Sequence, residues 1–202
     1  MTEKKSVEKG RPAVFLDRDG TINEQMGYIN HTCRFQLLPG AAAAIKILND
    51  AHIPVVVVSN QSGLARGYFP EELLDAVHAK MDRQLAEEGA HVDGIYYCPH
   101  HPEAKEEQFR AACTCRKPKP GLVLQAAEDL QLDPARSFVV GDRWSDIKTA
   151  ANCGARSVLV RTGYGRGDEK YIGPQQKIQP DHIADDLQKA VIWIMKSLKR
   201  AQ

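Results

Sequence analysis

Short apolar runs that alternate with helical stretches are the feature that most restricts the folds open to this chain. Apolar runs of strand length lie at residues 13–16, 54–58, 95–97, 137–140 and 157–160. Apolar residues at helical spacing lie between and after them, at 41–51, 70–88, 121–130, 145–152 and 185–198. Strands that alternate with helices form parallel βαβ units. We therefore expect an α/β fold: a three-layer, Rossmann-like parallel sheet with helices on both faces.

Composition adds a domain count and several exclusions. With 202 residues, 43% of them hydrophobic, the chain has the size and core of one domain, expected over 13–202 after a polar tail at 1–12. A formal net charge of +1 gives no long-range attraction to nucleic acid or to an acidic membrane. The sequence contains no apolar run long enough to span a bilayer and no secretory signal at its start. We expect a cytoplasmic protein without a membrane or nucleic-acid partner.

Polar residues follow three of the predicted strands directly. They are Asp17-Arg18-Asp19-Gly20-Thr21, Ser59-Asn60-Gln61-Ser62-Gly63 and Gly141-Asp142-Arg143-Trp144-Ser145-Asp146. The carboxyl ends of parallel strands meet at one edge of a sheet, so the carboxylates of Asp17, Asp19 and Asp142 would repel one another unless a cation lay between them. Oxygen ligands of this kind suit Mg²⁺. An Asp-x-Asp-Gly sequence alone is also typical of a solvated turn, but three matching strand ends favour a site.

Lys117, Arg116 and Ser59 would then be available to hold a phosphoryl group against that metal. Lysine acts as a point charge on a phosphate, and serine donates a hydrogen bond. The sequence therefore predicts phosphate chemistry at the strand ends.

The cysteines form a second pattern. Cys98-x-His100 and Cys113-x-Cys115 are separated by 12 residues, and the total of five cysteines fits a complete disulfide set poorly. Three sulfurs and one imidazole are a full tetrahedral shell for a structural Zn²⁺. The spacing differs from the common C-x₂-C knuckle, so the pattern alone is compatible either with zinc or with reduced thiols.

These motifs resemble a known family. The three strand-end sequences, together with Lys117, look like the four motifs of the haloacid-dehalogenase-like (HAD-like) phosphohydrolases. Within that superfamily, residues 15–23 (FLDRDGTIN), 59–69 (SNQSGLARGYF), 96–102 (YYCPHHP) and 113–121 (CTCRKPKPG) resemble the D-glycero-D-manno-heptose 1,7-bisphosphate 7-phosphatases. The resemblance covers about residues 13–165.

The resemblance implies roles for the strand-end residues. Asp17 would be the nucleophile that forms an aspartyl-phosphate, and Asp19 the general acid and base. Ser59 and Lys117 would stabilise the charge of the transferred phosphoryl group. Mg²⁺ would be bound by the Asp17 carboxylate, the backbone carbonyl of Asp19 and Asp142, with Asp146 hydrogen-bonded towards the metal site without ligating it.

The resemblance also implies a zinc loop at 98–115, with Cys98, His100, Cys113 and Cys115 as ligands and His101 as a bystander. Contacts to a small sugar bisphosphate are expected from loops next to the motifs. The candidates are Gln25, Met26, Gly27, Tyr28, Asn60, Gln61, Ser62, Arg66, Arg116 and Arg143.

The spacing of the motifs leaves no room for a large cap domain, which predicts an open site and permits a monomer. Of the other side chains, Trp144 is compatible with packing or with substrate contact, and His52, His78, His91 and His182 are expected at the surface or at helix ends. Two alternatives remain open. One is histidinol-phosphate phosphatase, which shares both patterns; the other is a zinc-stabilised binding module with inert acidic motifs.

Overall fold

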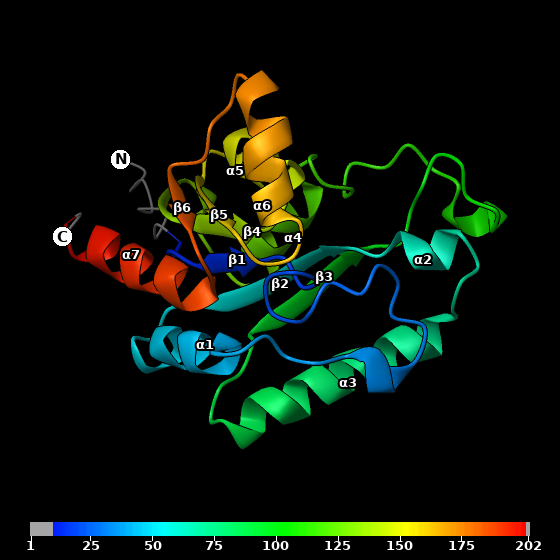
Figure 1. Cartoon of the computed structure of the whole chain (residues 1–202), viewed down its shortest axis with the longest axis horizontal. Helices are drawn as coiled ribbons and strands as arrows, with labels where there is room; N and C mark the ends of the chain where they lie inside the picture. The colour runs from blue at the N-terminus through cyan, green and yellow to red at the C-terminus, as the bar shows by residue number, and fades with distance from the viewer. Residues whose placement is uncertain (1–9, 201–202) are drawn as a thin grey trace, which may run out of the picture.

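A six-stranded, fully parallel sheet forms the centre of the molecule (Figure 1). The computed structural model describes residues 10–200. The strands are β1 (Val14–Leu16), β2 (Val55–Asn60), β3 (Gly94–Cys98), β4 (Phe138–Gly141), β5 (Arg156–Val160) and β6 (His182–Ala184). Their order is β3-β2-β1-β4-β5-β6, with Phe15 of β1 opposite Val56 and Val139. The sequence-based prediction of a parallel α/β sheet is confirmed.

Helices cover both faces of this sheet (Figure 1). One face packs against α1 (Ala41–Asp50), α3 (Glu71–Glu87) and α7 (Leu187–Lys199); the other packs against α4 (Gly121–Asp129) and α5 (Trp144–Cys153). The central strands are buried on both sides because successive side chains alternate between the faces. Val14 and Leu16 thus join the first core and Phe15 the second.

Local sequence explains where the principal helices start and end. Pro70 precedes α3, and Glu71 and Glu72 lie in its first turn, where carboxylates interact favourably with the helix dipole. The Asp186 carboxylate caps α7 by accepting a hydrogen bond from the Lys189 N–H. Gly154 ends α5 with φ 77°, in the left-handed region that glycine adopts without strain.

Several short elements were not expected from the sequence. They are α2 (Ser62–Ala65), α6 (Gly165–Gly167), a π-helical turn at Asp168–Ile172, strand β6, and 3₁₀ turns at Thr32–Arg34, Glu107–Phe109, Pro134–Arg136 and Gly173–Gln175. Strand β6 pairs with β5 at one edge of the sheet. Its three residues are too few to show a period in the sequence. The chain from Gly165 to Gln175 is rich in glycine and shows no apolar period either.

The motif spacing led to the expectation that no large cap domain is present, and the fold agrees within residues 10–200. Between β1 and β2 the chain forms one 3₁₀ turn and α1, and between β2 and β4 it forms short turns, α3, β3 and α4. Arg11 of the predicted tail pairs with Leu132, so this residue belongs to the fold. Residues 1–9 of the predicted tail, and positions 201–202, lie outside the described residues. No helix in the described part of the chain is both long enough and apolar enough to cross a membrane.

Candidate active site

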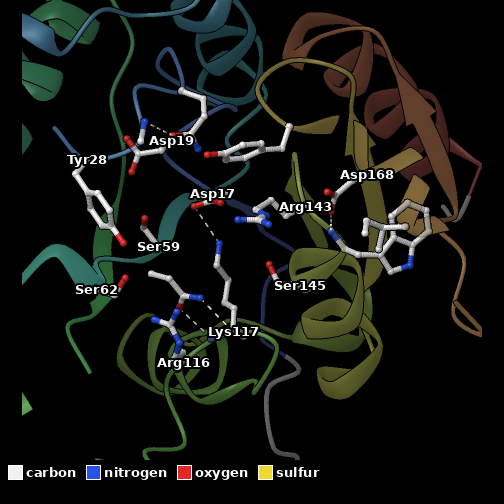
Figure 2. A pocket seen from close by; sticks show the side chains of 16 residues that line it. Asp17, Asp19, Tyr28, Ser59, Ser62, Arg116, Lys117, Arg143, Ser145 and Asp168 are labelled. Atoms are coloured by element: carbon white, nitrogen blue, oxygen red, sulfur yellow. Dashed lines mark hydrogen bonds and ion pairs between the residues drawn. The ribbon is translucent and has the colours of Figure 1, made fainter. Parts of the chain in front are cut away.

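A cavity of about 450 Å³ lies at the carboxyl ends of the strands (Figure 2). Asp17 follows β1, Ser59 and Asn60 end β2, and Asp142 follows Gly141 at the end of β4. The strand order reverses between β1 and β4, which is where open α/β sheets bind their ligands. The three strand-end sequences therefore meet as predicted.

Lys117 enters this site from the loop before α4 and is buried. Its Nζ lies 3.0 Å from Asp17 Oδ1 and 2.6 Å from Asp146 Oδ1, and it donates a hydrogen bond to the Val58 carbonyl at 2.8 Å. Burial opposes its charge, but the Asp146 and Asp17 carboxylates outweigh burial and raise the pKa of Lys117. The ammonium is therefore charged at neutral pH and aimed at the predicted nucleophile (Figure 2).

Asn60 fixes the backbone of that lysine. Its Oδ1 accepts from the Lys117 N–H at 3.0 Å, and its Nδ2 donates to the Lys117 carbonyl at 3.2 Å. The sequence suggested Asn60 only as a substrate contact. The residue does line the cavity, but both polar atoms of its amide are hydrogen-bonded to the Lys117 backbone.

Asp17, Asp142 and Asp146 form a buried carboxylate cluster in which one oxygen of each lies within 4.8 Å of the others. Burial, with smaller contributions from neighbouring carboxylates, raises the pKa of Asp17 to about 6 and that of Asp142 to about 8. Three carboxylates face one ammonium, so the fully ionised cluster has an excess of two negative charges.

The donors of this carboxylate cluster fit a divalent cation. Asp142 Oδ2 accepts a hydrogen bond from the Tyr164 N–H at 2.8 Å, whereas its buried Oδ1 has no partner among the described residues. Gly20 and Gly163 approach this carboxylate so closely that a Cβ at either position would collide with it. Oxygen donors and uncompensated negative charge are what Mg²⁺ requires.

Asp19 is held apart from the carboxylate cluster. Arg18 Nη2 donates to both of its oxygens, at 3.1 and 2.9 Å, Asn23 Nδ2 donates at 3.0 Å and Gln61 Nε2 at 2.9 Å. Burial would raise its pKa, but the Arg18 charge and the hydrogen bonds from Asn23 and Gln61 together lower it. In this structure Asp19 is therefore an oriented, ionised carboxylate that lines the cavity.

The predicted zinc ligands also come together. Cys98 Sγ lies 3.5 Å from Cys113 Sγ, 3.1 Å from Cys115 Sγ and 3.8 Å from His100 Nδ1, which is 3.4 Å from Cys115 Sγ. A tetrahedron with metal–sulfur bonds of about 2.3 Å has edges of about 3.8 Å, so the four donors have nearly the spacing of a zinc shell. The residues therefore fit a closed Zn²⁺ site.

Two thiols of this Cys/His cluster have pKa values that are shifted in opposite directions. Burial is the main cause that raises the pKa of Cys98, whereas hydrogen bonds from Cys115 and from the Arg116 backbone outweigh burial and lower that of Cys113 to about 6. Cys33 is exposed and Cys153 is half-buried, and neither belongs to the cluster.

Most of the predicted substrate-binding residues line the cavity, namely Gln25, Gly27, Tyr28, Asn60, Ser62, Arg116 and Arg143. Three do not. Met26 packs against the core, Gln61 is buried with its amide on Asp19 and Ser59, and Arg66 contacts His101 at 3.3 Å.

The sequence assigned no role to several lining residues near α5 and α6, namely Ser145, Tyr164, Asp168 and Ile172. Arg143 stacks 4.6 Å from the centre of the Tyr164 ring, and buried Asp168 accepts from the Trp144 N–H at 2.7 Å. Trp144 itself also borders the cavity, but it is buried and packs with Ile147 and Leu159. The Gly-rich segment that supplies Tyr164 and Asp168 gives no signal in the sequence.

The surface prediction for histidines is wrong for His78. Its side chain is buried on the face of α3 that contains Leu74, Val77 and Met81. His182, expected at the surface or at a helix end, lies in β6 and stacks on Trp193 with ring centres 4.7 Å apart. The helical spacing of residues 74, 77, 78 and 81 was the available signal for His78.

The fold and this site define an HAD-like hydrolase, and residues 114–190 match the HAD-hydrolase-like family model. The D-glycero-β-D-manno-heptose-1,7-bisphosphate 7-phosphatase of Escherichia coli K12 is 43% identical over 198 residues, which are 97% of this chain and 100% of that protein. The enzyme of the same name from Photorhabdus laumondii is 48% identical over 78% of this chain and 84% of its own. The chain belongs to this phosphatase family.

A solved structure agrees with this assignment. The D,D-heptose 1,7-bisphosphate phosphatase of B. bronchiseptica, complexed with magnesium and phosphate, superposes with a TM-score of 0.82 at 35% identity, covering 92% of this chain and 99% of that one. The corresponding phosphatase of Burkholderia thailandensis is 31% identical, with a TM-score of 0.67, and covers 92% of this chain and 99% of its own.

Proposed function

We propose that this chain is a Mg²⁺-dependent phosphatase that removes the C7 phosphate of D-glycero-β-D-manno-heptose 1,7-bisphosphate, a step towards nucleotide-activated heptose. The observation that carries the proposal is the Asp17–Lys117 pair at the floor of the cavity, 3.0 Å apart, in a chain 43–48% identical to phosphatases of that name. The β-anomer follows the names of these relatives, because the cavity geometry alone does not select it.

Asp17, Asp142 and the backbone carbonyl of Asp19 would hold the magnesium ion. When bound, Mg²⁺ would neutralise the excess charge of the carboxylate cluster and polarise the phosphoryl oxygens. Asp146 already receives the Lys117 ammonium and the Arg143 N–H, which supports a role outside the metal shell.

The first chemical step belongs to Asp17. One of its oxygens forms a bond to phosphorus while the bond between phosphorus and the C7 oxygen breaks, which gives an aspartyl-phosphate and a sugar alkoxide. Lys117 Nζ and Ser59 Oγ face the same cavity and would donate to the phosphoryl oxygens as their charge shifts. In this structure the three N–H donors of the lysine point to Asp17, Asp146 and the Val58 carbonyl, so the donor on Asp17 would turn to a phosphoryl oxygen when substrate binds, while the other two keep the ammonium in place.

Asp19 would transfer the protons. It gives one to the leaving alkoxide and then takes one from the water that attacks phosphorus and breaks the bond to Asp17. Its ionised resting form suits the second role. A bound phosphate beside it would raise its pKa by like-charge repulsion and so favour the protonated form needed first.

Arg116 and Arg143 reach the cavity from different elements, the zinc loop and the start of α5 (Figure 2). A substrate with two phosphates offers a second anion for such residues, and arginine binds phosphate in a bidentate manner. This arrangement favours a bisphosphate over a small monophosphate as substrate.

Zn²⁺ in the Cys/His cluster would be structural, because four protein donors leave no open position. Cys115 precedes Arg116 and Lys117 directly, so the ion would hold the loop that supplies both phosphate-binding side chains. The expected monomeric state and cytoplasmic location remain predictions.

The decisive experiment compares steady-state turnover of the α- and β-heptose bisphosphates and histidinol phosphate by the Mg²⁺-loaded protein. We expect the highest kcat/KM for the β-bisphosphate, with phosphorus NMR showing loss of the C7 phosphate and retention of the C1 phosphate. A preference for histidinol phosphate would replace the proposal by the competing phosphatase activity. No hydrolysis of any phosphate monoester would favour the zinc-stabilised binding module.

A further inference from the structure

Arg18 is an unusual buried residue that the mechanism above does not use. Its side chain is 2% exposed, although a guanidinium keeps its charge at any ordinary pH. Among the described residues its guanidinium has two partners, Asp19 and His78, and its Nε has none. A buried charge of this kind is costly unless its donors are paired, so both contacts matter for where the side chain lies.

His78 provides the second of these contacts from α3. Its Nε2 lies 3.1 Å from Arg18 Nη1. Arginine has no acceptor, so the imidazole must present a lone pair at Nε2 and carry its proton on Nδ1. Burial and the adjacent Arg18 charge lower the pKa of His78 to about 4, which agrees with a neutral ring at physiological pH.

The position of the His78 ring is itself fixed. It lies on the buried face of α3, and its centre is 5.8 Å from that of Tyr97 in β3. Tyr97 is the register partner of Ser59 in β2. The ring therefore packs between α3 and the part of β3 that pairs with Ser59, the serine proposed to bind the phosphoryl group.

Hydrogen bonds to two partners make the Arg18 guanidinium a bridge between His78 and Asp19. One terminal nitrogen, Nη1, is held by His78, and the other, Nη2, contacts both oxygens of Asp19. Because the guanidinium is planar and rigid, the contact at Nη1 restricts where Nη2 can lie, so the His78 ring helps to position Arg18 against Asp19. The Gln61 amide continues the chain of contacts from Asp19 to Ser59 Oγ, at 2.8 Å.

We propose that His78 is a positioning residue of the active site, which acts through Arg18 to hold the Asp19 carboxylate in the orientation required for proton transfer. The inference rests on the proposed function, because it assigns a consequence to the acid–base role of Asp19. It adds an imidazole on α3, outside the strand-end motifs, to the parts of the molecule that determine the rate.

The test uses His78→Leu, which fills the site but removes the lone pair, and His78→Gln, whose amide oxygen can still accept from Arg18. Two substrates are compared, the heptose bisphosphate and p-nitrophenyl phosphate, whose phenolate leaves without a proton. The value of kcat/KM reports steps up to departure of the leaving group. For the sugar phosphate, kcat/KM therefore depends on protonation of the leaving group by Asp19. For p-nitrophenyl phosphate it does not.

We expect His78→Leu to lower kcat/KM for the sugar phosphate about tenfold, since misplacement of a reacting group by a fraction of an ångström has effects of this order. The aryl phosphate value should stay near that of the parent, and His78→Gln should restore most of the sugar phosphate value. In an Arg18→Met background, His78→Leu should have no further effect on the ratio of the two values.

Leu85→Val is the matched control, because it trims a buried side chain of the same helix about two turns away from His78. It should reduce thermal stability and leave the substrate ratio unchanged.

Equal losses on both substrates in His78→Leu, or no recovery in His78→Gln, would reduce His78 to a packing residue and overturn the inference. If His78→Leu does not fold, His78→Asn, which is too short to reach Arg18, takes its place. A parent protein inactive on every phosphate ester would instead remove the proposed function.

Discussion

The carboxylate cluster and the Cys/His cluster both fit a cation, but they are built in opposite ways. Asp17 and Asp142 follow neighbouring strands of the buried sheet, and Asp146 lies one turn into the helix after β4, so regular secondary structure places all three carboxylates. The Cys/His cluster joins the end of β3 to a loop with one short 3₁₀ turn. One cluster is created by the fold, whereas the other holds a loop that has little else to fix it.

This difference in construction indicates a different role for each cation. Asp17 of the carboxylate cluster lines the cavity, and the buried Asp142 Oδ1 has no hydrogen-bond partner among the described residues, so a cation bound by this cluster would lie next to the substrate. None of the four residues of the Cys/His cluster is among those that line this cavity. Loss of the first cation should therefore affect rate, and loss of the second should affect stability. The predictions below test this contrast.

The largest expected effect is on rate. Asp17→Asn removes the nucleophile and keeps the shape of the side chain, so we expect kcat to fall by at least about 10⁴-fold, as when nucleophiles of other hydrolases are removed. The melting temperature should not fall, since the change relieves repulsion in the carboxylate cluster. Turnover assays and thermal unfolding of the same preparation check both parts. Retained turnover would mean that another group attacks phosphorus.

The second prediction concerns the Cys/His cluster. Cys113→Ala, or zinc chelation, should destabilise the protein by about 3 kcal/mol, because loss of a bound metal removes binding free energy from the folded state. For a chain of this size that corresponds to a fall in melting temperature of about 6–12 °C. Calorimetry together with metal analysis of the purified protein measures it.

Cys33→Ala is the control for that experiment, because Cys33 is an exposed cysteine outside the Cys/His cluster. It should retain both the metal and the melting temperature of the parent. Equal melting temperatures for Cys113→Ala and Cys33→Ala would show that the loop does not depend on zinc.

The third prediction concerns Asn60, which links the two regions by holding the Lys117 backbone to the end of β2. Asn60→Ala removes both hydrogen bonds, each of which contributes about 1 kcal/mol, so displacement of the lysine should lower kcat/KM by up to about 30-fold. Ser62→Ala, a neighbouring change in the cavity lining, should have a smaller effect. If zinc alone positions Lys117, then Asn60→Ala will resemble the parent.

Much of this contrast could be predicted from the sequence. Short apolar runs followed by Asp17, Ser59 and Asp142 predict the sheet edge, because the position of a residue after a buried strand determines its place. The spacing of Cys98, His100, Cys113 and Cys115 predicts the second cluster in the same way. In both cases local order along the chain is sufficient.

The parts that could not be predicted depend on tertiary contacts. The Asn60 amide holds the Lys117 backbone across 57 residues of sequence, and Arg18 meets His78 across 60. Tyr164 and Asp168 reach the cavity from a Gly-rich segment without periodicity. Side-chain partners so distant in sequence leave no pattern, whereas a buried face of α3 does. His78 was therefore the one residue of this group that the helical spacing should have revealed.

The smallest expected effect is a change in stability whose sign differs between the two clusters. Loss of a carboxylate should stabilise the Mg²⁺-free protein, whereas loss of a zinc ligand should destabilise the protein. Asp142→Asn should stabilise the Mg²⁺-free protein by about 1 kcal/mol at pH 8, since it removes one buried charge from a repulsive group. Burial raises the pKa of Asp142 from 3.8 to about 8, so the folded state keeps a proton that the unfolded state loses. Stability of the parent therefore falls as pH rises between these values, and the advantage of Asn grows over the same range.

Mg²⁺ should reverse the sign of this difference. The parent binds the ion and gains stability in proportion to its saturation, whereas Asp142→Asn lacks one ligand and gains less. Melting temperatures of the zinc-loaded parent and variant at pH 5 and pH 8, each with and without added Mg²⁺, test this prediction. A variant less stable than the parent at pH 8 without Mg²⁺ would show that the carboxylate cluster, like the Cys/His cluster, stabilises the fold. The contrast between the two regions would then disappear.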